Sequence, residues 1–352
     1  MIWLVWRQHR LQALVALLGL AALAAFLVPT GIQMHSAFER SGLDDCLRVA
    51  ARVEYVQVGA DPNRPVDAAS AQVAACEELA GQFSSRYGGL GLLGILLWFL
   101  PLFVGLFWGA PLVAREVEQG THRLVWTQGV SRLRWALAKF GLVGGGVVLL
   151  AVGYSLLMTW WRDPLDQAAG RQTASFLFDF DLKGAVPVGY ALFALALGIF
   201  AGVLTRRSQP AMAITLVGFL ALRLLVDMAA RQRFLAPLRR TFPTTGSARP
   251  NELTGDWVTK AGVYSAQGEP LSGGAFGNYS QAICPAPPPT TAGGTDTVDP
   301  CVSQFGAGSY NLELFQPADR FWTLQAIETA LFVALAVLLL LASVHWVRRR
   351  IS

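Results

Sequence analysis

Six long apolar stretches alternate with polar connections along the 352-residue chain. An α-helix needs about 20 mostly apolar residues to cross a bilayer, and each stretch comes close to that length. The pattern therefore predicts an all-α polytopic membrane protein with six transmembrane helices. The predicted spans are residues 11–28, 88–113, 135–160, 186–204, 211–229 and 322–347. Pro29 is expected to end the first span, and Pro101 to kink the second.

The connections differ in charge, and this difference predicts the orientation. Residues 1–10, 114–139, 205–210 and 347–352 hold 12 Lys/Arg in 48 residues, whereas residues 30–87, 161–185 and 230–321 hold 15 Lys/Arg in 175. Basic residues concentrate in short cytoplasmic connections. The denser side is therefore placed inside, together with both termini. With the spans given above, the predicted cytoplasmic segments are 1–10, 114–134, 205–210 and 348–352, and the extracytoplasmic segments are 29–87, 161–185 and 230–321.

The first ten residues, MIWLVWRQHR, have a pattern of their own. Ile2, Trp3 and Trp6 share one helical face, with Arg7 and Arg10 beside it. This spacing suits a short amphipathic helix at the inner membrane interface. Simple aromatic and basic anchors flanking the first span would give the same pattern.

All four cysteines fall in segments predicted to face outward, where disulfides persist. Local pairing would join Cys46 to Cys76 and Cys284 to Cys301, which is the simplest of three connectivities. Helical spacing in 37–86 predicts a helical hairpin closed by the first bond. The interval between the second pair holds too much Pro and Gly for regular structure.

Ionisable residues inside predicted spans are costly and are often functional or paired. Arg223 and Asp227 stand four apart on one helix face, so they can pair. Glu328 lies at a similar depth in the last span. The three are candidates for a charge cluster at the outer end, and snorkelling to the interface is the alternative. Small residues also recur four apart at Gly105/Gly109, Gly141/Gly145 and Gly198/Gly202, which favours close packing between helices of one chain.

The composition adds one exclusion that affects function. Charged residues make up 14% of the chain, well below the roughly 25% of soluble domains. None of Lys139, Lys183 and Lys260 follows a glycine, so the chain has no phosphate loop for ATP. No catalytic or metal-binding motif is found either. The chain is therefore not expected to be an enzyme or to hold a cofactor, and any ATP and Mg²⁺ would be bound by another subunit.

The connection between the second and third spans, AREVEQGTHRLVWTQGVSRLRWALAK, reads as helix, turn, short helix, turn and helix. Gly120 is expected to end one helix and Thr121 to begin the next, while Ser131 caps the third span. Leu124, Val125 and Trp126 are too apolar for a free solvated helix. Some surface is expected to cover them.

This connection resembles that of type-2 ABC exporter permeases, which carry an R-E-x-E-x-G-T-x-x-L pattern followed by S-R, an aromatic residue and a lysine. The matching positions are Arg115, Glu116, Glu118, Gly120, Thr121, Leu124, Ser131, Arg132, Trp135 and Lys139. Six spans with both termini inside, and a large outer segment before the last span, are similar too. The Ala/Gly/Arg-rich composition resembles permeases of actinobacteria.

The resemblance implies that a separate nucleotide-binding ATPase subunit, in two copies, binds the short helix from the cytoplasm of a bacterial cell. A second permease copy or a related permease would complete the complex in the cell membrane, with no nucleic-acid partner. The coupling residues would be Arg115, Glu116, Glu118, Gly120, Thr121, Arg123, Leu124, Val125 and Trp126. Phe103, Phe107, Leu216 and Phe219 would line a path for an amphiphilic or hydrophobic cargo. An ion-gradient-driven transporter and a membrane-anchored extracytoplasmic sensor are the alternatives.

Overall fold

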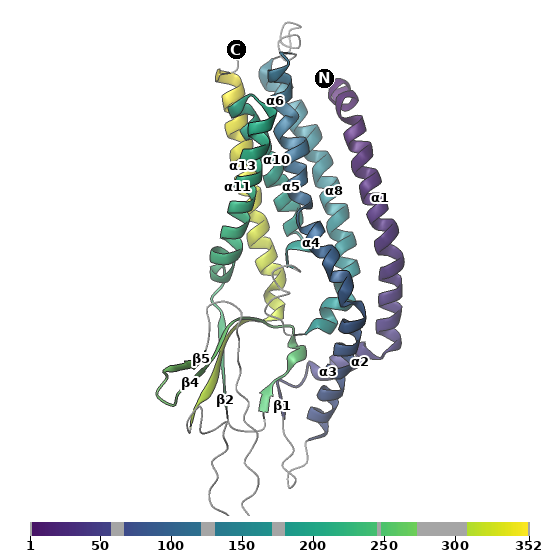
Figure 1. Cartoon of the computed structure of the whole chain (residues 1–352), viewed down its shortest axis with the longest axis vertical. Coiled ribbons are helices and arrows are strands. Elements are labelled where there is room, and N and C mark those ends of the chain that lie inside the picture. The colour runs from purple at the N-terminus through teal and green to yellow at the C-terminus, as the bar shows by residue number, and fades with distance from the viewer. Residues whose placement is uncertain are drawn as a thin grey trace, which may run out of the picture.

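In a computed structural model of the chain, helices dominate and form one elongated bundle with a small sheet at one end (Figure 1). The structure describes residues 2–57, 67–120, 131–170, 180–244, 248–272 and 308–350. Six helical segments in these ranges are long and apolar enough to cross a membrane. Both chain ends lie at one end of the bundle, here called the terminal end, and the opposite end is called the sheet end. The predicted helical membrane fold is thereby confirmed.

The first span is a single helix, α1 (Ile2–Arg40), which runs unbroken from the N-terminal residues to the sheet end. Residues 2–10 are therefore part of this helix and do not form a separate one, and Pro29 does not end the helix. Proline is tolerated inside membrane helices where hydroxyl groups bond to nearby carbonyls. Thr30 Oγ1 does so here, donating to the carbonyl of Phe26 at 2.9 Å.

The second span is interrupted near Pro101, where a kink is predicted. Its helix stops before Phe99 and restarts immediately after it, and a wider π turn follows. Proline removes a backbone donor and crowds the preceding turn, which explains the break. In chain order the segments are η1 (Gly88–Gly91), α4 (Leu92–Trp98), α5 (Leu100–Val104), η2 (Gly105–Gly109) and α6 (Ala110–Glu118).

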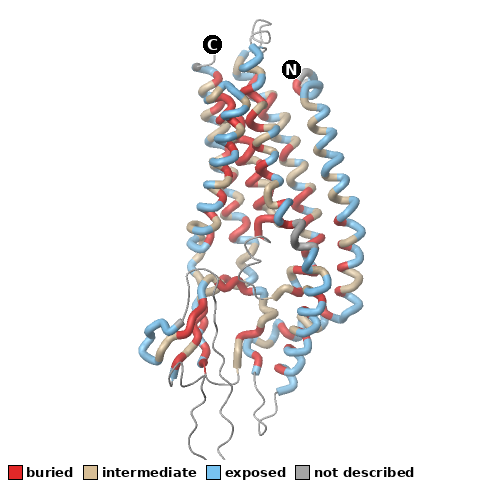
Figure 2. The backbone as a smooth tube through the Cα atoms, viewed as in Figure 1, coloured by how far each residue is buried: buried red, intermediate tan, exposed pale blue. Residues whose placement is uncertain are grey.

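The remaining spans surround a central helix, α10 (Val186–Thr205). Buried positions concentrate along the middle of the bundle, whereas α1 is exposed along most of its length (Figure 2). Around α10 pack α8 (Arg132–Ala169), α11 (Ser208–Leu225) and α13 (Phe321–Arg350). The fifth span continues beyond α11 through a π turn, η3 (Val226–Ala230), and a 3-10 turn, η4 (Arg231–Arg233).

Beyond the bundle, a helical hairpin packs under the sheet end of α1. It consists of α2 (Leu43–Ala50) and α3 (Ala68–Tyr87), joined by the predicted Cys46–Cys76 disulfide. Asp67 caps α3 by accepting a hydrogen bond from Ser70 N at 2.6 Å. This bond to the ionised form, together with the hydroxyl of Ser70, lowers the pKa of the Asp67 carboxyl below its ordinary value.

The largest connection contains an antiparallel sheet that the all-α prediction omitted. Its strands are ordered β2-β6-β4-β5, and a separate pair joins β1 to β3. The bounds are β1 (Tyr55–Gln57), β2 (Leu238–Pro243), β3 (Ala248–Pro250), β4 (Trp257–Tyr264), β5 (Pro270–Ser272) and β6 (Tyr310–Gln316), with short 3-10 turns η5 (Glu252–Thr254) and η6 (Ala318–Arg320). Cys284 and Cys301 lie outside the described residues, so their predicted disulfide stays a prediction.

Candidate functional sites

The predicted coupling connection begins as expected where the structure describes it. The helix α6 is followed by Gly120, whose φ of 70° is the left-handed conformation that favours glycine at a helix end. At the other side, Ser131 Oγ accepts a hydrogen bond from Arg134 N at 3.3 Å and caps α8. Both predicted helix boundaries are confirmed. Thr121, Arg123, Leu124, Val125 and Trp126 lie outside the described residues.

Two acidic residues of this connection hold helices of the same chain together. Glu116 Oε1 lies 2.5 Å from Lys139 Nζ, and the lysine side chain is 2% exposed. Lys139 Nζ also donates to the carbonyl of Leu112 at 3.3 Å. The pair links α6 to α8 at the terminal end. Glu116 is one of the predicted coupling residues, and the structure gives it an ionic partner within the chain.

Glu118 makes an equivalent link to the fifth span. Its Oε2 accepts from Ser208 N at 3.2 Å and from Ser208 Oγ at 3.1 Å. A carboxylate at this position satisfies an amide at the start of α11 and is favoured by the helix dipole. Arg115, in contrast, is exposed. Three helices therefore meet at the root of the connection, which we call the coupling base (Glu116, Glu118, Lys139 and Ser208).

At the sheet end, charged side chains gather in the core of the bundle around Arg231, which is fully buried. Its Nε donates to Glu328 Oε2 at 2.9 Å, and its Nη1 to Asp227 Oδ1 at 2.5 Å. Its Nη2 lies 2.5 Å from Asp181 Oδ1 and 3.2 Å from the Tyr190 hydroxyl. All three guanidinium nitrogens are thus hydrogen-bonded. We call this group the sheet-end cluster (Asp181, Tyr190, Arg223, Asp227, Arg231 and Glu328).

Arg223 belongs to the same cluster, but it does not pair with Asp227. Its Nη2 lies 3.0 Å from Asp181 Oδ2, and its Nη1 donates to the carbonyl of Trp98 at 2.6 Å. The guanidinium also stacks over the Trp98 ring, 3.7 Å from the centroid. Asp227 pairs with Arg231 instead. The Arg223–Asp227 pair that their spacing allows is therefore not formed, because the helix packing brings Asp181 to Arg223.

Of the two cluster members that the sequence analysis missed, Arg231 and Asp181, only Arg231 carries a signal in the sequence. Arg231 follows Asp227 by four residues, which is the spacing of a helical ion pair. Asp181 had no such signal, since it sits in a connection just before α10. Burial by itself would raise the pKa of the Asp181 carboxyl, but the two guanidinium groups outweigh it and hold the pKa below its ordinary value. The ion pairs of this cluster join four segments of the chain.

Two of the three glycine pairs pack against one another where the second and fourth spans cross. A Cβ added at Gly198 would lie 2.5 Å from Gly105 O, and one at Gly202 would lie 2.6 Å from Ala110 O. Neither backbone can therefore tolerate a side chain there. Gly141 and Gly145 differ, because an added Cβ meets nothing within 4 Å at either position. Close packing within the chain is thus found for two predicted pairs only.

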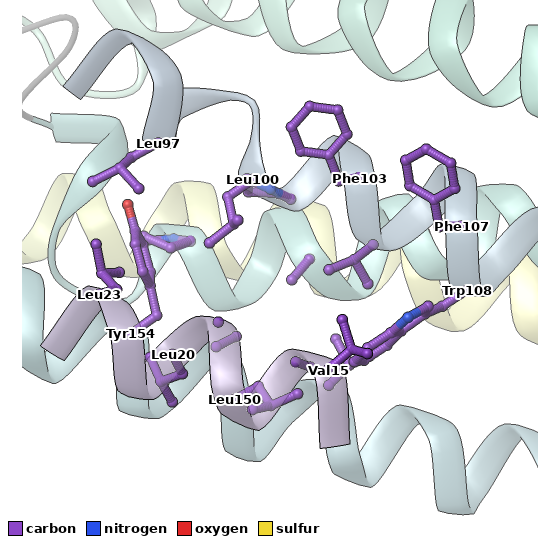
Figure 3. A pocket seen from close by; sticks show the side chains of 18 residues that line it. Val15, Leu20, Leu23, Leu97, Leu100, Phe103, Phe107, Trp108, Leu150 and Tyr154 are labelled. Atoms are coloured by element: carbon purple, nitrogen blue, oxygen red, sulfur yellow. The ribbon is translucent and has the colours of Figure 1, made fainter. Parts of the chain in front are cut away.

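The four residues predicted to line a transport path are separated by the structure. Phe103 and Phe107 stack with ring centroids 6.1 Å apart on the wall of an apolar cavity beside α1 (Figure 3). Phe219 is fully buried against Tyr190 and Phe193 in the core. Leu216 is 39% exposed and is absent from the cavity wall. The four therefore do not form one continuous surface within a single chain.

The fold and these sites define a class: a polytopic helical membrane protein with buried charges paired between segments of the chain. Comparison with known families is more specific. Residues 17–231, more than half of the chain, match the family described as ABC-2 membrane transporter related, and the chain belongs to this family. The resemblance to type-2 ABC permeases is thereby confirmed. The protein is a membrane subunit of an ABC transporter, which works with an ATPase subunit. No curated protein and no solved structure matches the chain.

Proposed function

We propose that this chain is the membrane-spanning subunit of an ATP-driven exporter in a bacterial cell membrane. Its terminal end would face the cytoplasm, and its sheet end would lie outside. Two copies of a separate ATPase subunit would bind residues 114–134 of two permease chains. ATP-driven closure of the ATPase pair would then switch the permeases between inward and outward access. The cargo would be amphiphilic or hydrophobic.

The coupling base is the single observation that carries this proposal. Gly120 turns the chain out of α6 directly after two carboxylates that bind α8 and α11. A displacement of the connection would act on three helices at once, because ionic and capping contacts transmit force better than a free loop. This arrangement is what a subunit without its own phosphate loop needs in order to receive motion from another protein.

The contact with the ATPase is tested by co-purification. The chain is expressed together with a candidate ATPase subunit from the same genome, and each variant is isolated through a tag on the permease. Trp126→Asp is expected to reduce ATPase recovery at least tenfold, because an aromatic anchor at the centre of an interface contributes about 2 kcal/mol or more. Trp126→Phe, the matched control, keeps an apolar ring and is expected to retain most of the binding.

The coupling role has a separate readout. Glu118→Gln keeps a side chain of the same shape but weakens the bond to the start of α11. We expect this variant to bind the ATPase normally and to hydrolyse ATP, while ATP-dependent transport of a fluorescent amphiphile in proteoliposomes falls several-fold. Full transport by the permease alone, driven by an ion gradient without the ATPase, would contradict the proposal and favour a secondary transporter. ATP-dependent transport in the import direction would contradict the proposed direction only and would leave the coupling to the ATPase intact.

A further inference from the structure

An apolar cavity of about 630 Å³ lies between α1, the broken second span and α8 (Figure 3). This volume falls within the range of small-molecule sites, about 300–1,000 Å³. Aliphatic side chains of α1 form one wall, and Phe103 and Phe107 line the cavity from α5 and η2. The two phenylalanines are 43% and 56% exposed, and Val15 on the opposite wall is 61% exposed. The cavity therefore opens sideways, at a surface that faces lipid in a spanning chain.

One polar group inside this cavity has no hydrogen-bond partner in the part of the chain that the structure describes. Tyr154 is 4% exposed, and its hydroxyl makes no hydrogen bond with any described residue. Its ring stands between Leu23 and Leu97, with the hydroxyl directed toward Leu97 (Figure 3). A buried hydroxyl left unbonded is destabilising, whereas phenylalanine would fill the same space without that cost. The position of this phenol indicates that a ligand oxygen accepts its hydrogen bond.

The position of Tyr154 along the membrane normal limits which kind of ligand can reach its hydroxyl. It precedes Trp160 by six residues on α8, which is about 9 Å at 1.5 Å per residue. Tryptophans at the ends of spans lie at headgroup level. The hydroxyl thus sits just inside the hydrocarbon region, where the upper end of an acyl chain is found. Apolar walls continue from there toward the terminal end as far as Val15 and Trp108.

We propose that the cavity binds an acyl chain of a bilayer lipid that enters sideways past α1, with its ester carbonyl accepting a hydrogen bond from Tyr154. The acyl chain occupies the space between α1 and α5. Aliphatic contacts supply most of the affinity, and the hydroxyl fixes how deep the chain sits. This site concerns binding and is independent of the direction of transport.

The test uses the full chain in phosphatidylglycerol vesicles, with phosphatidylcholine probes that carry a photoreactive diazirine in the acyl chain. Cross-links are mapped by mass spectrometry, and we expect them in residues 15–23 and 147–154. Gly19→Leu should reduce this labelling at least fivefold, because Gly19 lines the cavity and an added Cβ there meets nothing within 4 Å. Gly141→Leu is the matched control, since that glycine is equally uncrowded but lies outside the cavity wall.

The hydrogen bond is tested with a second probe in which an ether replaces the ester and therefore lacks the carbonyl. The unmodified chain should prefer the ester about fivefold, the effect of one neutral hydrogen bond. Tyr154→Phe should abolish this preference while keeping the melting temperature in lipid-poor detergent equal or higher. Labelling outside the cavity, or labelling unaffected by Gly19→Leu, overturns the site. Equal labelling by both probes, or a lower melting temperature for Tyr154→Phe, overturns the role of the hydroxyl.

Discussion

The helices α1 and α10 are both strongly apolar, yet they occupy opposite environments. In the most apolar window of α10, 67% of the residues are buried within the chain, against 6% for the first span. Hydropathy indicates that a helix can enter a membrane. It does not indicate whether lipid or other helices surround that helix, because lipid tails and protein cores are equally apolar. Glycines at the crossing and charges at the sheet end give α10 its contacts with other helices. The sheet-end half of α1 is held by a few specific contacts, and its terminal half borders a cavity.

Among the variants considered, one that removes Arg231 from the centre of the sheet-end cluster should cause the largest loss of stability around α10. Arg231→Met would leave Asp181 and Glu328 buried without their main cation, and we expect a loss of about 3–5 kcal/mol of stability. Thermal unfolding in detergent measures it. Arg233→Met, two residues away at an exposed position, should have little effect. Equal losses for both would show that the cluster does not stabilise the packing around α10.

Loss of the Cys46–Cys76 disulfide, which lies at the sheet end of α1, should cause the second-largest loss of stability. Replacing both Cys46 and Cys76 by serine removes a link between residues 30 apart, which is worth about 3–4 kcal/mol in the chain-entropy picture. The loss should be local to α2, α3 and the sheet end of α1. Hydrogen exchange would detect it there and leave α10 protected. Exchange that increases uniformly over both helices would contradict the separation of the two regions.

The glycine crossing should show a smaller effect. Gly198→Ala pushes a methyl group against the backbone of the second span, and we expect a loss of about 1–3 kcal/mol. Gly145→Ala meets open space and should be neutral or slightly stabilising, since alanine favours helix. Thermal unfolding curves of the two variants in detergent measure the difference in stability. If both variants behave alike, close backbone contact is not what positions α10.

The smallest effect is expected where α1 is tied to α8. Trp161 Nε1 donates to Thr30 Oγ1 at 3.0 Å, so Thr30→Val leaves a mostly buried indole without its acceptor and should cost about 1 kcal/mol. Ser36→Ala is the control, because that hydroxyl bonds only within α1 at an exposed position. Cysteine accessibility on α1 should rise in the first variant alone. An unchanged α1 would mean that aliphatic packing suffices to hold it.

Several features of the molecule were predictable because their causes are local in the chain. A run of apolar residues determines a span, and a left-handed glycine or a serine cap marks a helix boundary. Gly120, Ser131 and the Cys46–Cys76 bond followed from such signals. The paired roles of Glu116 and Glu118 did not, since an acidic side chain near a helix end looks the same whether it meets water, a partner or another helix.

The sequence by itself determined that this is a helical membrane protein of the ABC-2 type with six segments apolar enough to cross a membrane. Tertiary structure alone decided which helix is central, that Asp181 rather than Asp227 receives Arg223, and that β2 and β6 pair across the chain. It alone also revealed a cavity with an unbonded hydroxyl beside α1. The physical reason is that membrane insertion depends on the hydropathy of one segment, whereas ion pairing, strand pairing and cavities depend on groups that only the folded chain brings together.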